Sequence, residues 1–294
     1  MLGFGTTLWL RAAHHDIAQL DRALDAAVQQ LLQIDGAMNL FDPDSQISRL
    51  NRDGLLRSPS PHLLAVLSAS SQVAQRSGGL FDVTVQPLWR CWWEAAQAGR
   101  HPRADHLASA MRKVDWRAID IDRHRIRFAR VGMAITLNGI AQGYAAEQTA
   151  RLLRRHGISQ ALLDTGEWAS LGRNPAGDDW TLGLENPASG RPLLRLTLPV
   201  DHRVAMSSNA LQLLGPDHHH VLDPRSGHSP HALAAVAVVA SNAMLADALT
   251  KPMFMGDAGQ AIRLASTWQV GVVTIDRLGQ WTVSPNLSAH VRPV

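Results

Sequence analysis

Apolar residues recur along this chain at helical spacing in some segments and as alternating or continuous runs in others. Between residues 17 and 36 they fall three and four positions apart, which predicts an amphipathic helix that ends near Gly36. The same spacing predicts a helix over 61–77, closed by the glycine pair Gly78-Gly79. Residues 131–155 are expected to run as strand, glycine turn and helix. Two more helices are expected in "SNAMLADALTKPMFMG" and "AGQAIRLAST".

Strands are expected where apolar residues alternate or form short continuous runs. A short strand is predicted over 6–11, and "LFDVTVQPLWRCWW" alternates before a group of large aromatic residues. The region 99–130 is polar and irregular, apart from a hairpin predicted in "AIDIDRHRIRFAR". A buried strand with its exit turn is predicted in "ISQALLDTGEWASLG", and weaker strands are predicted in 179–206. A buried strand is predicted in "AAVAVVA" and a closing hairpin in "VGVVTIDRLGQWTV". Helices mixed with strands that mostly lack βαβ order indicate an α+β fold, a single domain over 1–294 with two interlocked lobes.

The stretch "LNGIAQGYAAEQ" places Gly139 and Gly143 four residues apart at the start of a helical pattern. A P-loop requires Lys and Ser or Thr directly after its last glycine, and Tyr144 stands there instead. A dinucleotide-binding fingerprint requires a third glycine, which this stretch lacks. The glycines alone favour a strand-to-helix turn with close backbone packing. The N–H groups of the following helix could still meet an anion.

Three consecutive histidines, His218 to His220, precede "VLDPRSGHSP". On a strand such residues would point to alternate faces, so at most two could share one metal ion. No Cys, His or Asp cluster with zinc-ligand spacing accompanies them. A polar loop is therefore the favoured interpretation, and one buried histidine beside Asp223 could act as an acid or base.

In "SNAMLADALTKPM", Thr250 and Lys251 follow Asp247 by three and four residues and so share its helical face. One interpretation is an exposed Asp–Lys pair of little energetic consequence. The other is a site of oxygen ligands for a hard cation such as Mg²⁺. Pro252 is expected to kink the helix.

Asp82 lies in "SGGLFDVTV", between a glycine pair and the alternating segment. An aspartate that caps nearby N–H groups in a turn is the common case at such a position.

Composition narrows the function classes. The 294 residues carry a formal net charge of +3, and nearly all basic side chains are arginines, since Lys113 and Lys251 are the only lysines. We see no basic stripe of the kind that marks a nucleic-acid-binding protein. The single cysteine, Cys91, excludes an internal disulfide. No run reaches the roughly 18 apolar residues of a membrane span.

The N-terminal segment "MLGFGTTLWLRAAHHD" has no basic n-region, no long apolar h-region and no cysteine for lipid attachment. We therefore expect the chain as written to be cytoplasmic, and periplasmic if a leader is missing from it.

Several motifs follow one another in an order typical of a known family. The "GT" strand is followed by "FDPDSQISRLN", "GGLFDVTVQPL", "GIAQGYA", "GEWASLG", "HVLDPRSG" and "ADALT". Together they resemble the FAD:protein FMN transferase family, the ApbE-like flavin transferases, over essentially the whole chain. The resemblance implies a T-fold-like, two-lobed α+β architecture with FAD bound between the lobes.

The resemblance also implies an activity. With Mg²⁺, such a protein transfers FMN from FAD to a Thr or Ser hydroxyl of an acceptor flavoprotein and releases AMP. Two alternatives stay open: a Mg²⁺-dependent FAD pyrophosphatase that gives FMN and AMP, and a non-catalytic FAD-binding module.

Roles are implied position by position. His220 matches the proton-transfer position, and the implied metal ligands are the carbonyl of Ala141, the carboxylate of Asp247 and Thr250. The implied FAD contacts are Phe4, Phe41, Leu80, Phe81, Asp82, Asn138, Tyr144 and Val221.

The chain departs from the family pattern where the chemistry is expected. Gln142 replaces the usual Lys, Glu147 replaces an Asp, and Gly166-Glu167-Trp168 replaces a Gly-Gly-Asp turn. The metal-binding Thr of the family lies four residues after the Asp, where this chain has Lys251.

Two hypotheses follow. Thr250 ligates Mg²⁺ after a small adjustment of the helix at Pro252, or the Lys251 ammonium takes the place of the cation's charge. Titration of Mg²⁺ in the presence of FAD separates them. Metal binding by Lys251→Ala but not by the unaltered chain would contradict the first hypothesis.

Overall fold

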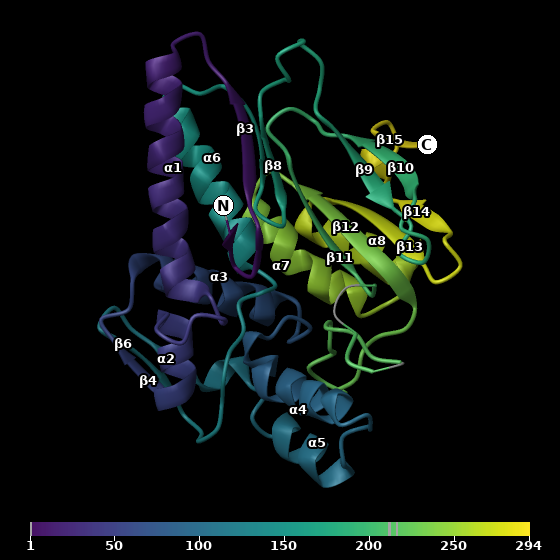
Figure 1. The fold of residues 1–294 in the computed structure, drawn as a ribbon. Coiled ribbons are helices and arrows are strands. Elements are labelled where there is room, and N and C mark those ends of the chain that lie inside the picture. The colour runs from purple at the N-terminus through teal and green to yellow at the C-terminus, as the bar shows by residue number, and fades with distance from the viewer. Residues whose placement is uncertain (1, 211–212, 216) are drawn as a thin grey trace.

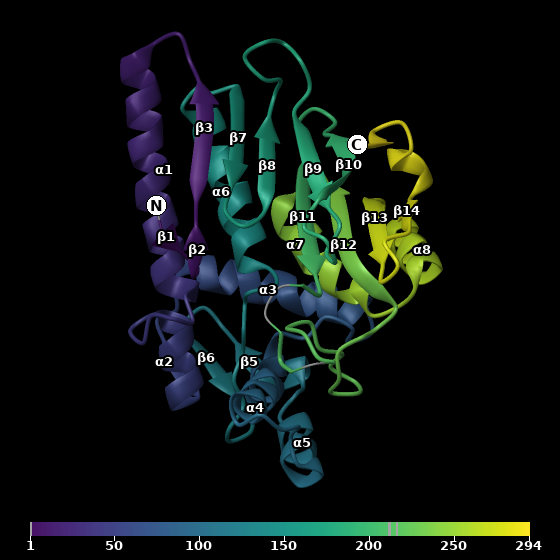
Figure 2. The same ribbon diagram turned by 45° about the vertical axis from the view of Figure 1, so that its right-hand side comes forward.

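The computed structural model describes residues 2–210, 213–215 and 217–294, and its centre is an antiparallel sheet. Within the described residues this sheet has seven strands, and Figure 2 shows them side by side. Their order across the sheet is β14 (Trp281–Val283), β13 (Gly271–Asp276), β12 (Leu233–Ala240), β11 (Arg203–Ser208), β8 (Trp168–Leu171), β7 (Gln160–Asp164) and β3 (Trp9–Ala13).

The sheet is covered on both faces. Helices α6 (Ala141–Arg155), α7 (Ala243–Phe254) and α8 (Ala258–Trp268) pack on one face, and α1 (Ile17–Met38) packs outside α6 (Figure 1). A second sheet, of β9 (Thr181–Glu185), β10 (Pro192–Thr197) and β15 (Val291–Pro293), packs on the other face through a shared apolar cluster. This double cover explains β12, whose residues are all buried and whose sequence is a continuous apolar run rather than an alternating one.

The remaining elements form a mainly helical part at one end of the large sheet, at the bottom of Figures 1 and 2. Apolar residues of the segments 46–76 and 126–128 join the cluster that lies beneath α7 and α8, and Leu88, Trp92 and Ala110 form a separate cluster with Leu214 and Leu222. Its helices are α2 (Gln46–Asp53), α3 (Pro61–Arg76), α4 (Gln86–Gln97) and α5 (Ala104–Met111), and its strands are β4 (Leu55–Arg57), β5 (Ile119–Ile121) and β6 (Arg125–Phe128). The other short elements are β1 (Leu2–Gly3), β2 (Thr6–Thr7) and the 3-10 turns η1 (Val83–Val85), η2 (Trp116–Ala118) and η3 (Pro285–Leu287).

The predicted α+β class is confirmed, as are most individual elements. The helix after Ser60 begins with Pro61 in its first turn and ends before Gly78 and Gly79, both of which have positive φ. The hairpins β5–β6 and β13–β14 lie where alternation predicted them. The segment expected as a strand with an exit turn is a complete hairpin, β7–β8.

The strand-like prediction for "LFDVTVQPLWRCWW" was wrong. Asp82 accepts the N–H of Thr84 and starts the turn η1, and Pro87 stands in the first turn of α4. Leu88, Trp92 and Ala95 then follow at spacings of four and three, which buries one face of a helix. The region 99–130 was predicted to be irregular apart from one hairpin, but it also contains the helix α5.

The strand expected before the glycine stretch is corrected as well, and the kink expected at Pro252 stays a prediction. No strand precedes Gly139 in the described residues 131–140, and Gly143 lies inside the first turn of α6. Helix α7 continues past Pro252 to Phe254, so the proline stands in its last turn. None of the described helices is long and apolar enough to cross a membrane.

Candidate functional site

A cavity of about 1140 Å³ lies between the large sheet and the helical part. This volume is slightly above the range of about 300–1,000 Å³ that is typical of small-molecule and cofactor sites. Its walls come from segments that are far apart in the sequence. They are Thr6, the loop before α2 with part of α2, the residues from Leu80 into α4, residues 136–142 at the entry to α6, the β7–β8 turn, Met206 and Ser207 of β11, Leu213 and Leu214, residues 220–224, and α7 with Met255.

Most of the FAD contacts implied by the resemblance lie in these walls. The lining includes Phe41, Leu80, Phe81, Asp82, Asn138, His220 and Val221. Phe41 is 66% exposed, and its ring lies against Gly5, where a side chain would clash with it. The other implied residues, Phe4, Tyr144, Ala141, Asp247 and Thr250, lie outside the described lining.

Tyr144 and Phe4 are engaged elsewhere in the protein. The hydroxyl of Tyr144, which is buried, lies 2.8 Å from Nδ1 of His62 on α3. The N–H of Phe4 donates to Oδ1 of Asp35 on α1 at 2.6 Å. Any contact of these two residues with a ligand in the cavity therefore stays a prediction.

Asp82 uses its carboxylate to organise the cavity wall. Oδ1 accepts the N–H and the hydroxyl of Thr84 at 2.8 and 2.6 Å, and Oδ2 accepts the N–H of Trp116 at 3.1 Å. Burial raises the pKa of Asp82, against the opposite effect of these hydrogen bonds. The capping role expected from the sequence is confirmed, and the long-range bond to Trp116 extends it.

The paired helices α6 and α7 bring Asp247 close to the glycine stretch. Asp247 is 0% exposed, and its Oδ2 accepts the N–H of Gly143 at 3.1 Å. A Cβ on Gly143 would lie 2.3 Å from the carbonyl oxygen of Ala243, so only glycine allows this approach. The interpretation of Asp247 as part of an exposed pair was wrong, because α6 covers it.

Lys251 occupies the other side of the Asp247 carboxylate. Its Nζ lies 2.8 Å from Oδ1 and 3.4 Å from the carbonyl oxygen of Asp247. The side chain passes over Gly139, where an added Cβ would come within 2.6 Å of Cε. Unlike Asp247, Lys251 lines the cavity.

The oxygens of Ala141, Asp247 and Thr250 are ligand types that Mg²⁺ accepts. The Thr250 hydroxyl, however, donates to the carbonyl of Asp247 at 2.8 Å and lies 2.8 Å from Oγ of Ser207, in a fully buried position. The Asp247 carboxylate is held by Gly143 and Lys251. With Lys251 in this place the set does not fit a divalent cation, so the Mg²⁺ site stays a prediction that the geometry does not support.

Glu167 is a cavity residue that sequence reasoning treated only as a departure from a motif. It is buried on the β7–β8 turn, and its Oε2 accepts the N–H of Met206 at 2.9 Å. Burial raises the pKa of Glu167 well above its ordinary value, the charge of Asp247 raises it further, and Lys251 lowers it.

Gln142 ties this turn to α6. An added Cβ on Gly166, whose φ is +92°, would lie within 2.2 Å of the Gln142 amide nitrogen. The hydroxyl of Thr165 donates to the Gln142 carbonyl at 2.9 Å. Gln142, Gly166, Glu167 and Lys251 therefore share one wall of the cavity. The one sequence signal for this wall was that three of these positions depart from the family pattern.

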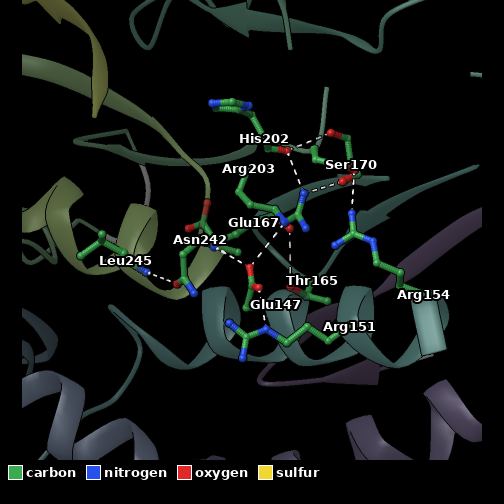
Figure 3. Close-up of polar contacts among 12 residues, drawn as sticks. Glu147, Arg151, Arg154, Thr165, Glu167, Ser170, His202, Arg203, Asn242 and Leu245 are labelled. Atoms are coloured by element: carbon green, nitrogen blue, oxygen red, sulfur yellow. Dashed lines mark hydrogen bonds and ion pairs between the residues drawn. The ribbon is translucent and has the colours of Figure 1, made fainter. Parts of the chain in front are cut away.

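Glu147 serves a buried ion pair rather than the cavity (Figure 3). Its Oε2 lies 3.4 Å from Nε of Arg203 on β11 and accepts the N–H of Ala243 at the start of α7. Its Oε1 accepts from Arg151 at 2.9 Å. The Arg203 guanidinium, 2% exposed, also donates to the carbonyls of Ser170 and His202. Glu147 thus joins α6, α7 and the sheet.

The three histidines lie in a loop and not on a strand, and each has a different environment. His218 stacks on Trp92 with ring centroids 3.6 Å apart. His219 is buried, and its Nε2 lies 3.0 Å from the carbonyl oxygen of Pro230. His220 lines the cavity. Asp223, expected near a histidine, pairs with Arg225 at 2.8 Å. Among the described residues no group of three or more His, Cys, Asp or Glu could hold a metal ion.

Proteins with sequences similar to this chain share one name. The chain is 24% identical over 275 residues to the FAD:protein FMN transferase of Haemophilus influenzae, covering 88% of this chain and 80% of the relative. It is 27% identical over 240 residues to a protein of that name from Klebsiella pneumoniae, covering 76% and 69%.

Solved structures agree. The flavin transferase ApbE from Vibrio cholerae superposes with a TM-score of 0.87 at 21% identity, over 99% of this chain and 97% of that one. The flavinyl transferase ApbE from Pseudomonas stutzeri gives 0.84 at 25% identity, over 97% and 93%. The model of the ApbE family matches residues 4–274. The chain therefore belongs to the ApbE family.

Proposed function

We propose that this protein transfers FMN from FAD to a Thr or Ser hydroxyl of an acceptor flavoprotein. The observation that carries the proposal is the position of His220, next to Val221, in the wall of a cavity whose other walls hold Phe81 and Asn138. These are residues that the family resemblance assigns to FAD, in a chain whose relatives are named FAD:protein FMN transferases.

The reaction breaks one phosphoanhydride bond and forms one phosphoester bond. The acceptor hydroxyl oxygen attacks the phosphorus of the FMN half, its proton passes to Nδ1 or Nε2 of His220, and AMP leaves with the bridging oxygen. The protein contributes position and charge: the cavity orients FAD, and a cation beside the diphosphate offsets the negative charge on the leaving AMP.

The experiment is incubation of the purified protein with FAD and a recombinant acceptor domain that carries one flavinylation Thr. We expect covalent flavin fluorescence on the acceptor after denaturing electrophoresis and one AMP released per flavin attached. The same acceptor with that Thr changed to Ala should stay unlabelled.

The variant His220→Asn is the matched test of the base. It should bind FAD as the unaltered chain does and lose transfer by about 100-fold or more, the usual contribution of a general base. Free FMN with AMP and an unlabelled acceptor would instead indicate an FAD pyrophosphatase. Bound FAD that stays intact would indicate a non-catalytic FAD-binding module.

A further inference from the structure

We propose that the ammonium group of Lys251 is the resident cation of this site and binds the diphosphate of FAD, so that FAD binding by this chain requires no divalent metal. The inference rests on the proposed function for the identity of the ligand. It concerns a different property of the site, namely which group supplies the positive charge.

The first observation is that both oxygens of the Asp247 carboxylate already have partners within the protein. Oδ1 lies 2.8 Å from the Lys251 ammonium, and Oδ2 accepts the N–H of Gly143 at 3.1 Å. A divalent ion bound to Oδ1 would stand next to an ammonium at a separation where like charges repel strongly. Lys251 and such an ion are therefore alternatives for one position.

The second observation is the order of groups from the cavity inward. Lys251 lines the cavity with a side chain that is 19% exposed, whereas Asp247 and Thr250 are fully buried behind it. A phosphate that enters the cavity thus meets the ammonium before any oxygen of these two residues. The cavity wall at Lys251 therefore offers a positive charge suited to an anion. The Asp247 carboxylate binds the ammonium on the side away from the cavity.

The third observation is that the surroundings make room for the lysine. Gly139 has no side chain, and a Cβ there would come within 2.6 Å of Cε of Lys251. The aliphatic part of the side chain passes this glycine and carries Nζ to Asp247. Gly139 therefore leaves the space through which the lysine side chain reaches Asp247.

Donor counting leaves one N–H for a ligand. An ammonium has three N–H donors. Two of them face Asp247, towards Oδ1 and towards the carbonyl oxygen at 3.4 Å. The third can donate to a phosphate oxygen as a charge-assisted hydrogen bond. Arg52 and Arg90 also line the cavity and add to its positive charge.

The test measures FAD binding rather than turnover. The affinity for FAD is determined by calorimetric titration, once with excess EDTA and once with Mg²⁺, for the unaltered chain and for Lys251→Met, Lys251→Thr and Lys113→Met. Riboflavin, which has no phosphate, is titrated in parallel. Lys113→Met removes the only other lysine of the chain, which lies against Gly132 outside the cavity lining, and serves as the matched control.

We expect the unaltered chain and Lys113→Met to bind FAD equally well with EDTA and with Mg²⁺. Lys251→Met should bind FAD about tenfold or more weakly in EDTA and bind riboflavin normally. In Lys251→Thr the Asp247 carboxylate is released beside a hydroxyl, so its weak FAD binding in EDTA should recover with Mg²⁺. Thermal melting of each variant shows whether it folds. If Lys251→Met does not fold, the comparison of Lys251→Thr with the unaltered chain still tests the inference.

Metal-dependent FAD binding by the unaltered chain would overturn the inference and leave the proposed function intact. Equal FAD affinity of Lys251→Met and the unaltered chain in EDTA would also overturn it. Absence of FAD binding in both buffers would count against the inference and the proposed function together. Failure of flavin transfer while FAD binds without metal would count against the proposed function alone.

Discussion

The backbone N–H of Gly143 on α6 donates to Oδ2 of Asp247 on α7 at 3.1 Å, across 104 residues of sequence. The bond requires the two helix backbones to lie nearly in contact. A Cβ on Gly143 would stand 2.3 Å from the carbonyl oxygen of Ala243 and 2.6 Å from Cβ of Asp247. The Ala243 carbonyl oxygen and the Asp247 Cβ are fixed to the backbone of α7, so they can move only if the helix moves.

Gly143→Ala should therefore be strongly destabilising. Overpacking of a buried contact costs about 1–3 kcal/mol, and backbone atoms leave little room for relief, so we expect about 3 kcal/mol. Urea denaturation measures the free energy of unfolding. Gly36→Ala in α1 is the control, because nothing lies within 4 Å of its added Cβ, and helix propensity predicts a gain of about 0.5–1 kcal/mol. Equal effects of the two substitutions would contradict the close-packing argument.

The ion pair of Glu147 and Arg203 supports a second prediction. Glu147→Gln leaves the Arg203 guanidinium, 2% exposed, without its counter-charge, so we expect a loss of about 3 kcal/mol of unfolding free energy. Arg151 pairs with the same carboxylate at 2.9 Å but is 53% exposed. Arg151→Gln should cost at most about 0.5 kcal/mol. Chemical denaturation of the two variants checks the difference, and a small effect of Glu147→Gln would show that the buried pair carries little stability.

Much of the fold could be predicted because local pattern and tertiary packing agree. The continuous apolar run of β12 is fully buried, and Pro61 and Gly78 stand at the two ends of α3 as helix signals require. The prediction for the segment that begins at Leu80 was wrong because its apolar and polar residues alternate as they do in a strand. What decides its structure is the Asp82 carboxylate, which accepts N–H groups from Thr84 and from Trp116, and the second of these lies 34 residues away.

The site was predicted less completely, for a similar reason. The spacing of Asp247 and Lys251 puts the pair on one helical face, and the structure confirms the contact. The burial of Asp247 depends on Gly143 of α6, so it could not be inferred from the sequence of α7 alone. The contact between Gln142 and Gly166 likewise joins two segments whose proximity only the folded chain shows.

His218 supports a prediction about pH. Burial, together with the neighbouring His228, His231 and His101, lowers its pKa from 6.5 to about 4, while Asp217 acts in the opposite direction. Between pH 4 and 6.5 the unfolded chain thus binds a proton at this site that the folded chain does not, so stability is lost as pH falls from about 6.5 to about 4. The full shift corresponds to about 3 kcal/mol. Solvent screening of this partly exposed ring reduces the expected loss to about 1 kcal/mol.

Comparison of the unaltered chain with His218→Gln isolates this contribution. The variant cannot titrate at this position, so its unfolding free energy should fall less steeply over the same pH range. Part of the slope should remain, because burial also lowers the pKa of His219. Identical pH profiles for the two proteins would show that His218 is not the group responsible.

Gly139 allows the role of Lys251 to be tested without altering any charge. An added Cβ would come within 2.6 Å of Cε of Lys251, near the end of a flexible side chain that can turn away. Gly139→Ala should therefore change the free energy of unfolding by less than about 1 kcal/mol. It should nevertheless weaken FAD binding in EDTA, since the ammonium can no longer reach the same place.

The double variant Gly139→Ala/Lys251→Met separates this mechanism from a direct effect of the new methyl group on FAD. If Gly139→Ala acts by displacing Lys251, it should have no further effect on FAD affinity once the lysine is gone, so the two losses are non-additive. Calorimetric titration of FAD in EDTA with the four proteins of the cycle gives the coupling. Additive losses would mean that Gly139 contacts FAD independently of Lys251, and the space at Gly139 would then serve the ligand rather than the lysine.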